Sequence, residues 1–152
     1  MAKKTKDLKY YEAVGRRKEA TAIARLYIPE KEGEAVVSGL KIKKGEIFVN
    51  GKPIEEIYKA KDKEERVIYQ KPLKLTDCED RFATSIKVSG GGKRGRLFAI
   101  TLAVSRALVL VDQNYRSILK KEGLLTVDSR VKERRKVGTG GKARREKQSP
   151  KR

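Results

Sequence analysis

The segment RFATSIKVSGGGKRGRLFAITLAVSRALVLV, residues 81–111, carries the strongest fold signals in the chain. Apolar or hydroxyl side chains alternate with smaller or charged ones in residues 81–89, which predicts a half-buried strand. After the glycines, apolar residues recur at helical spacing from Leu97 to Val111, and Phe98 belongs to a second apolar face. A helix that is apolar on both sides is usually central and buried. The segment therefore predicts a strand, a short glycine-rich connection and a buried helix.

The flanking sequence predicts further strands and helices of one small domain. Alternating patterns predict strands that begin at Tyr10 and cover residues 20–28 and 46–50, the last closed by an Asn-Gly turn. Residues 29–45 are interpreted as a loop with room for a short strand at 35–37. Helices are predicted after Pro53, over 62–69 with Pro72 as its stop, and over 112–122. The resulting fold class is α+β, a small sheet of three to four strands packed on helices.

Composition excludes several kinds of chemistry. The chain has 152 residues, 39 Lys and Arg, 20 Asp and Glu, no His and one Cys, for a net charge of +19. Without His there is no imidazole catalysis or ligation, and one Cys allows neither an internal disulfide nor a Cys-rich zinc site. No apolar run approaches the roughly 20 residues that span a bilayer. Such a surplus of positive charge favours a polyanionic partner, either nucleic acid or an acidic membrane face.

Charge and apolar content divide the chain into three parts. Residues 1–9 form a basic lead, residues 10–126 the globular body, and residues 127–152 a tail with eleven Lys or Arg and three Asp or Glu. The only large apolar side chains of the tail are valines, so we expect it to be disordered when free of a partner. It lacks both the apolar face of a membrane-surface helix and aromatic residues for base stacking. Either it is a solvated extension, or it follows phosphates, which its charge density favours.

The glycine-rich connection has three interpretations. Gly90, Gly92 and Gly95 fit the G-x-G-x-x-G pattern of dinucleotide-binding loops. That interpretation is the weakest, because residues 97–111 form one uninterrupted helical pattern and the chain is short for further βαβ units. The connection is otherwise a tight turn into a buried helix, or a loop that holds nucleic-acid phosphates at a helix N-terminus. The cations around it are Lys93, Arg94 and Arg96.

A second cationic cluster follows Gly15, at Arg16, Arg17 and Lys18. It is either a solvated turn or a phosphate contact, and in so basic a chain we favour the contact because Arg offers a planar fork to phosphate oxygens. The paired acids at 55–56 and 64–65 lie among lysines, so we interpret them as solvated helix faces. The residues thus predict a domain that binds folded nucleic acid. We expect it to have no catalytic residues, no metal site and no cofactor.

Several motifs occur together in the order of a known family. They are GRRK (15–18), VNG (49–51), KPLKLT (71–76), VSGGG (88–92), SRAL (105–108), LTVDSRVKERRKVG (125–138), KARR (142–145) and the terminal KR. Their order and spacing resemble the ninth protein of the bacterial-type small ribosomal subunit. Unlike that family, this chain carries about a dozen extra residues between Pro29 and Glu46, which we expect to form a surface loop or a hairpin. It also has Ser149-Pro150 before the terminal Lys-Arg.

The resemblance implies a fold, a role and residues for each contact. Members of the family are similar in fold to the second domain of the fifth small-subunit protein, and they are structural constituents rather than enzymes. They bind ribosomal RNA in the head of the subunit, next to other head proteins of the cytoplasmic ribosome, and their tail contacts the backbone of peptidyl-site transfer RNA. By resemblance, the residues expected to bind ribosomal RNA are Arg16, Arg17, Lys18, Arg134, Arg135, Lys136, Lys142, Arg144 and Arg145. To these we add the other cations of the glycine-rich connection and of the tail start, which are Lys93, Arg94, Arg96, Arg130 and Lys132. Lys151 and Arg152 are expected to contact transfer RNA.

Overall fold

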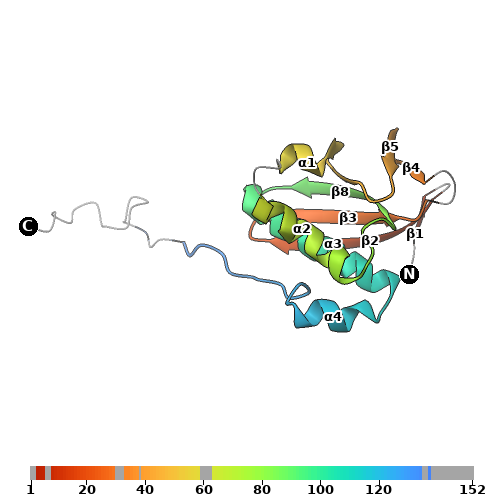
Figure 1. Ribbon diagram of the computed structural model, residues 1–152. Helices are drawn as coiled ribbons and strands as arrows, with labels where there is room; N and C mark the ends of the chain where they lie inside the picture. The colour runs from red at the N-terminus through yellow and green to blue at the C-terminus, as the bar shows by residue number, and fades with distance from the viewer. Residues whose placement is uncertain are drawn as a thin grey trace, which may run out of the picture.

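The computed structural model describes residues 3–5, 8–29, 33–37, 39–58, 63–134 and 137. These residues form an α+β fold in which a six-stranded sheet of order β1-β2-β3-β8-β6-β7 packs on helices (Figure 1). β6 and β8 run parallel, and the other neighbouring pairs are antiparallel. The elements are β1 (Lys3–Thr5), β2 (Leu8–Arg17), β3 (Ala20–Tyr27), β4 (Glu34–Val37), β5 (Leu40–Lys43), β6 (Ile47–Val49), β7 (Lys52–Pro53), α1 (Ile54–Ile57), α2 (Lys63–Leu75), β8 (Ala83–Ser89), α3 (Lys93–Val111) and α4 (Tyr115–Lys121).

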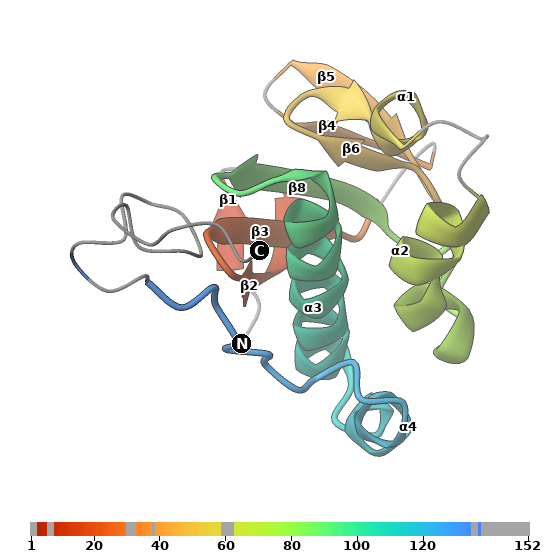
Figure 2. The ribbon, with the colours of Figure 1, turned by 90° about the vertical axis from the view of Figure 1, so that its left-hand side faces the viewer.

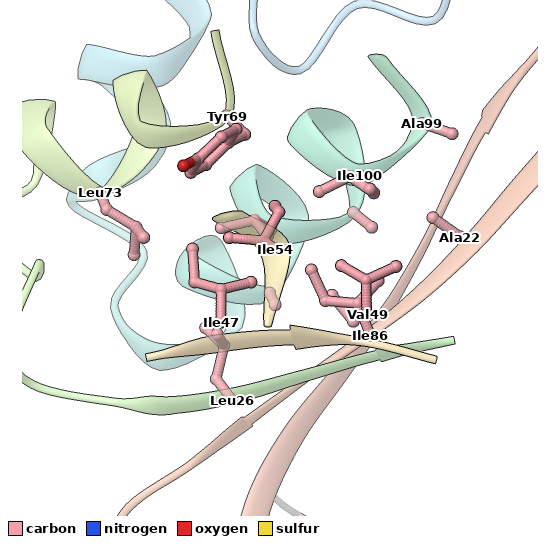
Figure 3. Packing of buried hydrophobic residues seen from close by; sticks show 14 of the residues in the cluster. Ala22, Leu26, Ile47, Val49, Ile54, Tyr69, Leu73, Ile86, Ala99 and Ile100 are labelled. Atoms are coloured by element: carbon pink, nitrogen blue, oxygen red, sulfur yellow. The ribbon is translucent and has the colours of Figure 1, made fainter. Parts of the chain in front are cut away.

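The helix α3 is the centre of the core, as its two apolar faces predict. Its middle, from Ala99 to Val109, is buried at every position except Arg106. Gly15 of β2 lies so close to α3 that a Cβ atom there would overlap the carbonyl oxygen of Ala99. Figure 3 shows side chains of the sheet, such as Val49 and Ile86, gathered in one cluster with Tyr69 of α2 and Ile100 of α3. The glycine thus permits β2 and α3 to pack almost backbone to backbone.

Four strands agree with the sequence patterns, but the predicted number of strands was too low. β2, β3, β6 and β8 correspond to the strands expected from Tyr10 and at 20–28, 46–50 and 81–89. The described residues add β1 and β7 at the two edges of the sheet. β1 lies in the basic lead, which has no apolar alternation, and β7 has two residues. β1 and β7 are strands because each pairs with a neighbouring strand, and the local sequence pattern does not encode that pairing.

The prediction that Pro72 stops the second helix was wrong, because Pro72 lies inside α2. Proline removes a backbone donor, so the carbonyl four residues earlier loses its helical partner. That carbonyl belongs to Ile68 and lies 3.5 Å from the hydroxyl of Thr101 on α3, which also donates to the carbonyl oxygen of Leu97 at 3.0 Å. Packing against α3 therefore lets α2 continue through the proline to Leu75.

The extra residues after Pro29 include a hairpin of β4 and β5, which was one of the two alternatives expected for this stretch. Ala35 and Ile42 of the hairpin are buried in a second apolar cluster with Tyr10, Tyr27 and Ala83. Tyr27 alternates with the residues of β3 that face α3, so this cluster lies on the other face of the sheet. The hairpin therefore covers part of the sheet face opposite α3.

Candidate nucleic-acid interface

The glycine-rich connection packs directly on the turn between β2 and β3. Gly90 and Gly91 have φ angles of +69° and +60°, which side chains other than glycine rarely adopt. A Cβ atom at Gly90 would overlap the carbonyl oxygen of Glu19, and one at Gly91 would lie 2.8 Å from the Cβ of Ala20. The connection is therefore a tight turn into a buried helix, and it brings the first turn of α3 beside the cluster that begins at Arg16.

The first turn of α3 is exposed and carries cations and no acid. Gly92 is its N-cap and provides no side-chain hydrogen bond, and the positive end of the helix dipole favours an anion there. Arg94 and Arg96 are exposed, and Arg96 donates through Nε to the carbonyl oxygen of Gly90 at 2.8 Å. This hydrogen bond fixes the side chain over the glycine turn.

Lys93 is tied to α1 and α2. Its Nζ lies 2.8 Å from Oε2 of Glu65 and 5.6 Å from the centre of the Tyr58 ring. Burial raises the pKa of Tyr58, and the charge of Glu65 raises it further. Lys93 therefore links the helix N-terminus to the helices beside it, whereas Arg94 in the same turn is exposed.

The segment 126–130, here called the tail root, runs beside this cationic end and is held by Arg17. One nitrogen of Arg17, Nη1, donates to the carbonyl oxygens of Asp128 at 3.1 Å and Arg130 at 2.8 Å. The other, Nη2, lies 2.9 Å from Oδ2 of Asp128. Arg130 also binds this carboxylate through Nε and Nη2, at 3.0 Å and 2.8 Å to its two oxygens. Hydrogen bonds from Arg130 are the largest reason that the pKa of Asp128 lies far below its usual range, and the charge of Arg17 adds to it.

The structure brings three of the expected binding segments together and leaves part of the tail outside its scope. Arg16, near the end of β2, and Lys18, on the turn that follows, are exposed near the first turn of α3 and the tail root. The expected site residues further along the described chain are exposed cations without helix or strand structure. These last residues are Arg130, Lys132 and Arg134. The predicted contacts that lie outside the described residues are Arg135, Lys136, Lys142, Arg144, Arg145, Lys151 and Arg152.

Sequence reasoning missed three residues at this end of the molecule. Asp128 was counted only as a charge of the tail, although its pairing with Arg17 joins the tail root to the body. Arg106 was read as part of an apolar helix, yet its Nη1 donates to the carbonyl oxygen of Val14 at 2.7 Å. Phe98 was expected to be buried and is 47% exposed. The signal for the first was an acid at the start of a basic tail, two residues before Arg130.

No group of three His, Cys, Asp or Glu side chains within the described ranges is arranged to hold a metal ion. Nor is any helix among those residues long and apolar enough to cross a membrane. An exposed cationic end on a small α+β body defines a class of basic proteins that bind polyanions.

Comparison with known proteins narrows the class to one family. The model of the family "Ribosomal protein S9/S16" matches residues 15–152. The small ribosomal subunit protein uS9 of Maridesulfovibrio salexigens is 43% identical over 137 residues, 90% of this chain and 92% of the relative. That of Methylacidiphilum infernorum is 43% identical over 134 residues, 88% and 87% of the two chains, and that of Cytophaga hutchinsonii is 37% identical over 126 residues, 83% and 86%. The chain belongs to the ribosomal protein S9 family, whose members are structural components of the small subunit of the cytoplasmic ribosome and not enzymes.

Proposed function

We propose that this structural ribosomal protein binds ribosomal RNA of the subunit head through its cationic end, and that its tail contacts peptidyl-site transfer RNA. The observation that carries the proposal is the meeting of the β2–β3 turn, the first turn of α3 and the tail root at one end of the body. Each of the three adds exposed Lys or Arg side chains. Phosphate contacts of this kind supply affinity and orientation without reading sequence.

The cations divide between contact and positioning. Arg16, Lys18, Arg94 and Arg96 are exposed and face solvent, so they are available to phosphate oxygens. Arg17 acts mainly by holding the tail root, because its Nη1 and Nη2 are engaged with Asp128 and Arg130. Lys93 supports the helix N-terminus in the same way, through Glu65.

In this proposal the tail extends the positively charged surface beyond the body. Residues 127–152 hold eleven Lys or Arg, and in this proposal Lys132, Arg134 and the cations that follow neutralise ribosomal RNA phosphates. Lys151 and Arg152 make the last contact, on the backbone of the transfer RNA. Docking of the body fixes where the tail begins, and the terminal pair contributes to transfer RNA binding only.

Substitution of the terminal pair tests this division of roles. With Lys151 and Arg152 changed to Gln, we expect normal incorporation into small subunits and about fivefold weaker peptidyl-site transfer RNA binding, because each screened phosphate contact contributes little. The matched control changes Lys120 and Lys121, an exposed pair at the end of α4, to Gln. Failure of the tail variant to enter subunits would contradict the division, as would equal loss of transfer RNA binding in both variants.

Sedimentation separates the ribosomal role from that of a free RNA-binding module. We expect the chain to sediment with small subunits and whole ribosomes at equal stoichiometry and to remain there after a high-salt wash. Release to the top of the gradient at moderate salt would instead identify a loosely bound cationic protein, since binding by phosphate contacts alone weakens steeply with salt.

A further inference from the structure

A groove of about 450 Å³ separates α3 from the tail root and the end of α4. Figure 2 shows α3 and α4 with the segment that leaves α4 and runs back past α3. The groove is within the size range of small-ligand sites, about 300–1,000 Å³. The residues that line it are Arg16, Arg17, Phe98, Thr101, Leu102, Glu122, Gly123, Leu124, Thr126, Asp128 and Arg130.

Phe98 is the large aromatic surface of this groove. Its neighbours in sequence, Leu97 and Ala99, are fully buried, whereas Phe98 is 47% exposed. Residues four apart lie on the same face of a helix, so Arg94 is one turn before Phe98 and Leu102 is one turn after it. A cation, an aromatic ring and an aliphatic side chain therefore follow one another along the groove side of α3.

The charge of the groove is positive because its acids already have partners. Glu122 lies 2.8 Å from Nζ of Lys71, and Asp128 is engaged by Arg17 and Arg130. Arg16 adds an exposed guanidinium at the rim. The groove therefore suits a ligand that combines a flat apolar face with negative charge beside it.

We propose that this groove binds an unpaired base of RNA, which stacks on Phe98 while Arg16 and Arg94 contact the flanking phosphates. Bases of single-stranded RNA stack on aromatic side chains, and their phosphates remain outside within reach of cations. The inference rests on the proposed function and adds to it a defined contact for one nucleotide. It also assigns a role to an exposed ring that packing of the core does not require.

Binding measurements on the full chain test the stacking contact. For a short single-stranded RNA of mixed sequence, we expect Phe98→Ala to weaken binding about tenfold and Phe98→Tyr, which keeps the ring, to change it little. Val67→Ala is the control, because Val67 is a 60% exposed apolar residue of α2 outside the groove. Phe98→Ala should leave the dependence of affinity on salt unchanged, whereas Arg94→Gln should reduce the salt slope by about one ion. Unchanged affinity of the Phe98→Ala variant would overturn the proposal.

Tryptophan fluorescence locates the contact directly, because the chain contains no Trp. In the Phe98→Trp variant we expect quenching by the single-stranded RNA and little quenching by duplex RNA, and in Val67→Trp little quenching by either. Equal quenching at both positions, or by both RNAs, would overturn stacking in the groove. Tight RNA binding without quenching at position 98 would reject the groove and leave the proposed function intact, and absence of RNA binding would reject both. Loss of subunit incorporation in Phe98→Ala with unchanged RNA affinity would assign the groove to a neighbouring protein instead.

Discussion

The helix α3 and the tail root lie side by side at one end of the molecule and are held by different forces. α3 is fixed by burial, since most of its side chains are removed from solvent against β2, β3 and α2. The tail root buries none of its side chains, and the contacts that join it to the β2–β3 turn are those of Arg17 with Asp128 and Arg130.

Because of this difference, α3 resists changes in solution conditions, whereas the contacts of the tail root can be exchanged. Burial of apolar surface is insensitive to moderate salt and to acid, whereas exposed ion pairs are weakened by both. The body can therefore keep one shape while the tail root changes its partners. A ribosomal protein needs both properties if its body docks first and its tail then follows RNA.

The substitution expected to have the largest effect is Gly15→Ala, which tests the packing of the buried region. The added Cβ would overlap the carbonyl oxygen of Ala99, so β2 and α3 must separate. We expect the free energy of unfolding to fall by about 3 kcal/mol or more, measured by urea denaturation. Gly95→Ala is the control, because its Cβ would lie 3.6 Å from the nearest atom and alanine favours a helix. A loss below 1 kcal/mol in Gly15→Ala, about that of a surface substitution, would show that the close approach is not required.

A smaller effect is expected where a polar side chain joins elements of the body. The side chain of Asn50 pairs with the backbone of Val88, accepting at 2.9 Å and donating at 3.0 Å. Asn50 also has a φ angle of +51°. We expect Asn50→Ala to lower the free energy of unfolding by about 2 kcal/mol, from two lost hydrogen bonds and backbone strain. Asn50→Gly relieves the strain, so it should cost less in the same denaturation experiment; equal losses would exclude strain as a contribution.

Apolar periodicity predicted the body well because burial imposes it. The pattern of residues 81–111 gave β8, the glycine turn and α3 in order, and alternation located β2, β3 and β6. The pattern could not give β1 or β7, whose pairing at the sheet edges is a tertiary property. It also failed at Pro72, where α2 continues through the proline and the carbonyl of Ile68 lies against the hydroxyl of Thr101, 33 positions away on α3.

The sequence predicted the positive charge of the candidate site, but it did not predict which residues bind one another there. The sequence identified the cations at 16–18 and around the glycine turn, and it left open whether the glycines form a tight turn or a phosphate loop. It could not indicate that Arg17 binds Asp128, 111 positions along the chain, because no periodic pattern links a hairpin turn to a tail. The exposure of Phe98 was also hidden, since apolar spacing does not distinguish a core face from a groove.

Arg17→Gln tests the tail root. Removal of the guanidinium should raise amide hydrogen exchange at Arg130, whose N–H donates to Oδ1 of Asp128 at 3.0 Å, while the free energy of unfolding falls by less than about 1 kcal/mol because the contact is near the surface. Arg16→Gln is the matched control, an adjacent exposed arginine that makes none of these contacts with the tail root. The same loosening is expected in the unaltered chain at high salt. Unchanged exchange in Arg17→Gln would show that the tail root is held by other contacts.

The smallest expected effect is a change in the acid sensitivity of the tail root. The pKa of Asp128 is lowered in the folded chain, so the contribution of its ion pairs is complete above the ordinary carboxyl range and is lost as the pH falls through the lowered value. Hydrogen bonds from Arg130 are the largest cause and the charge of Arg17 the smallest. Arg130→Gln should therefore raise the pKa of Asp128, followed by carboxyl NMR shifts, more than Arg17→Gln does. The reverse order would mean that Arg17 both positions the tail root and sets its charge, and the two arginines would then not have the separate roles that the geometry gives them.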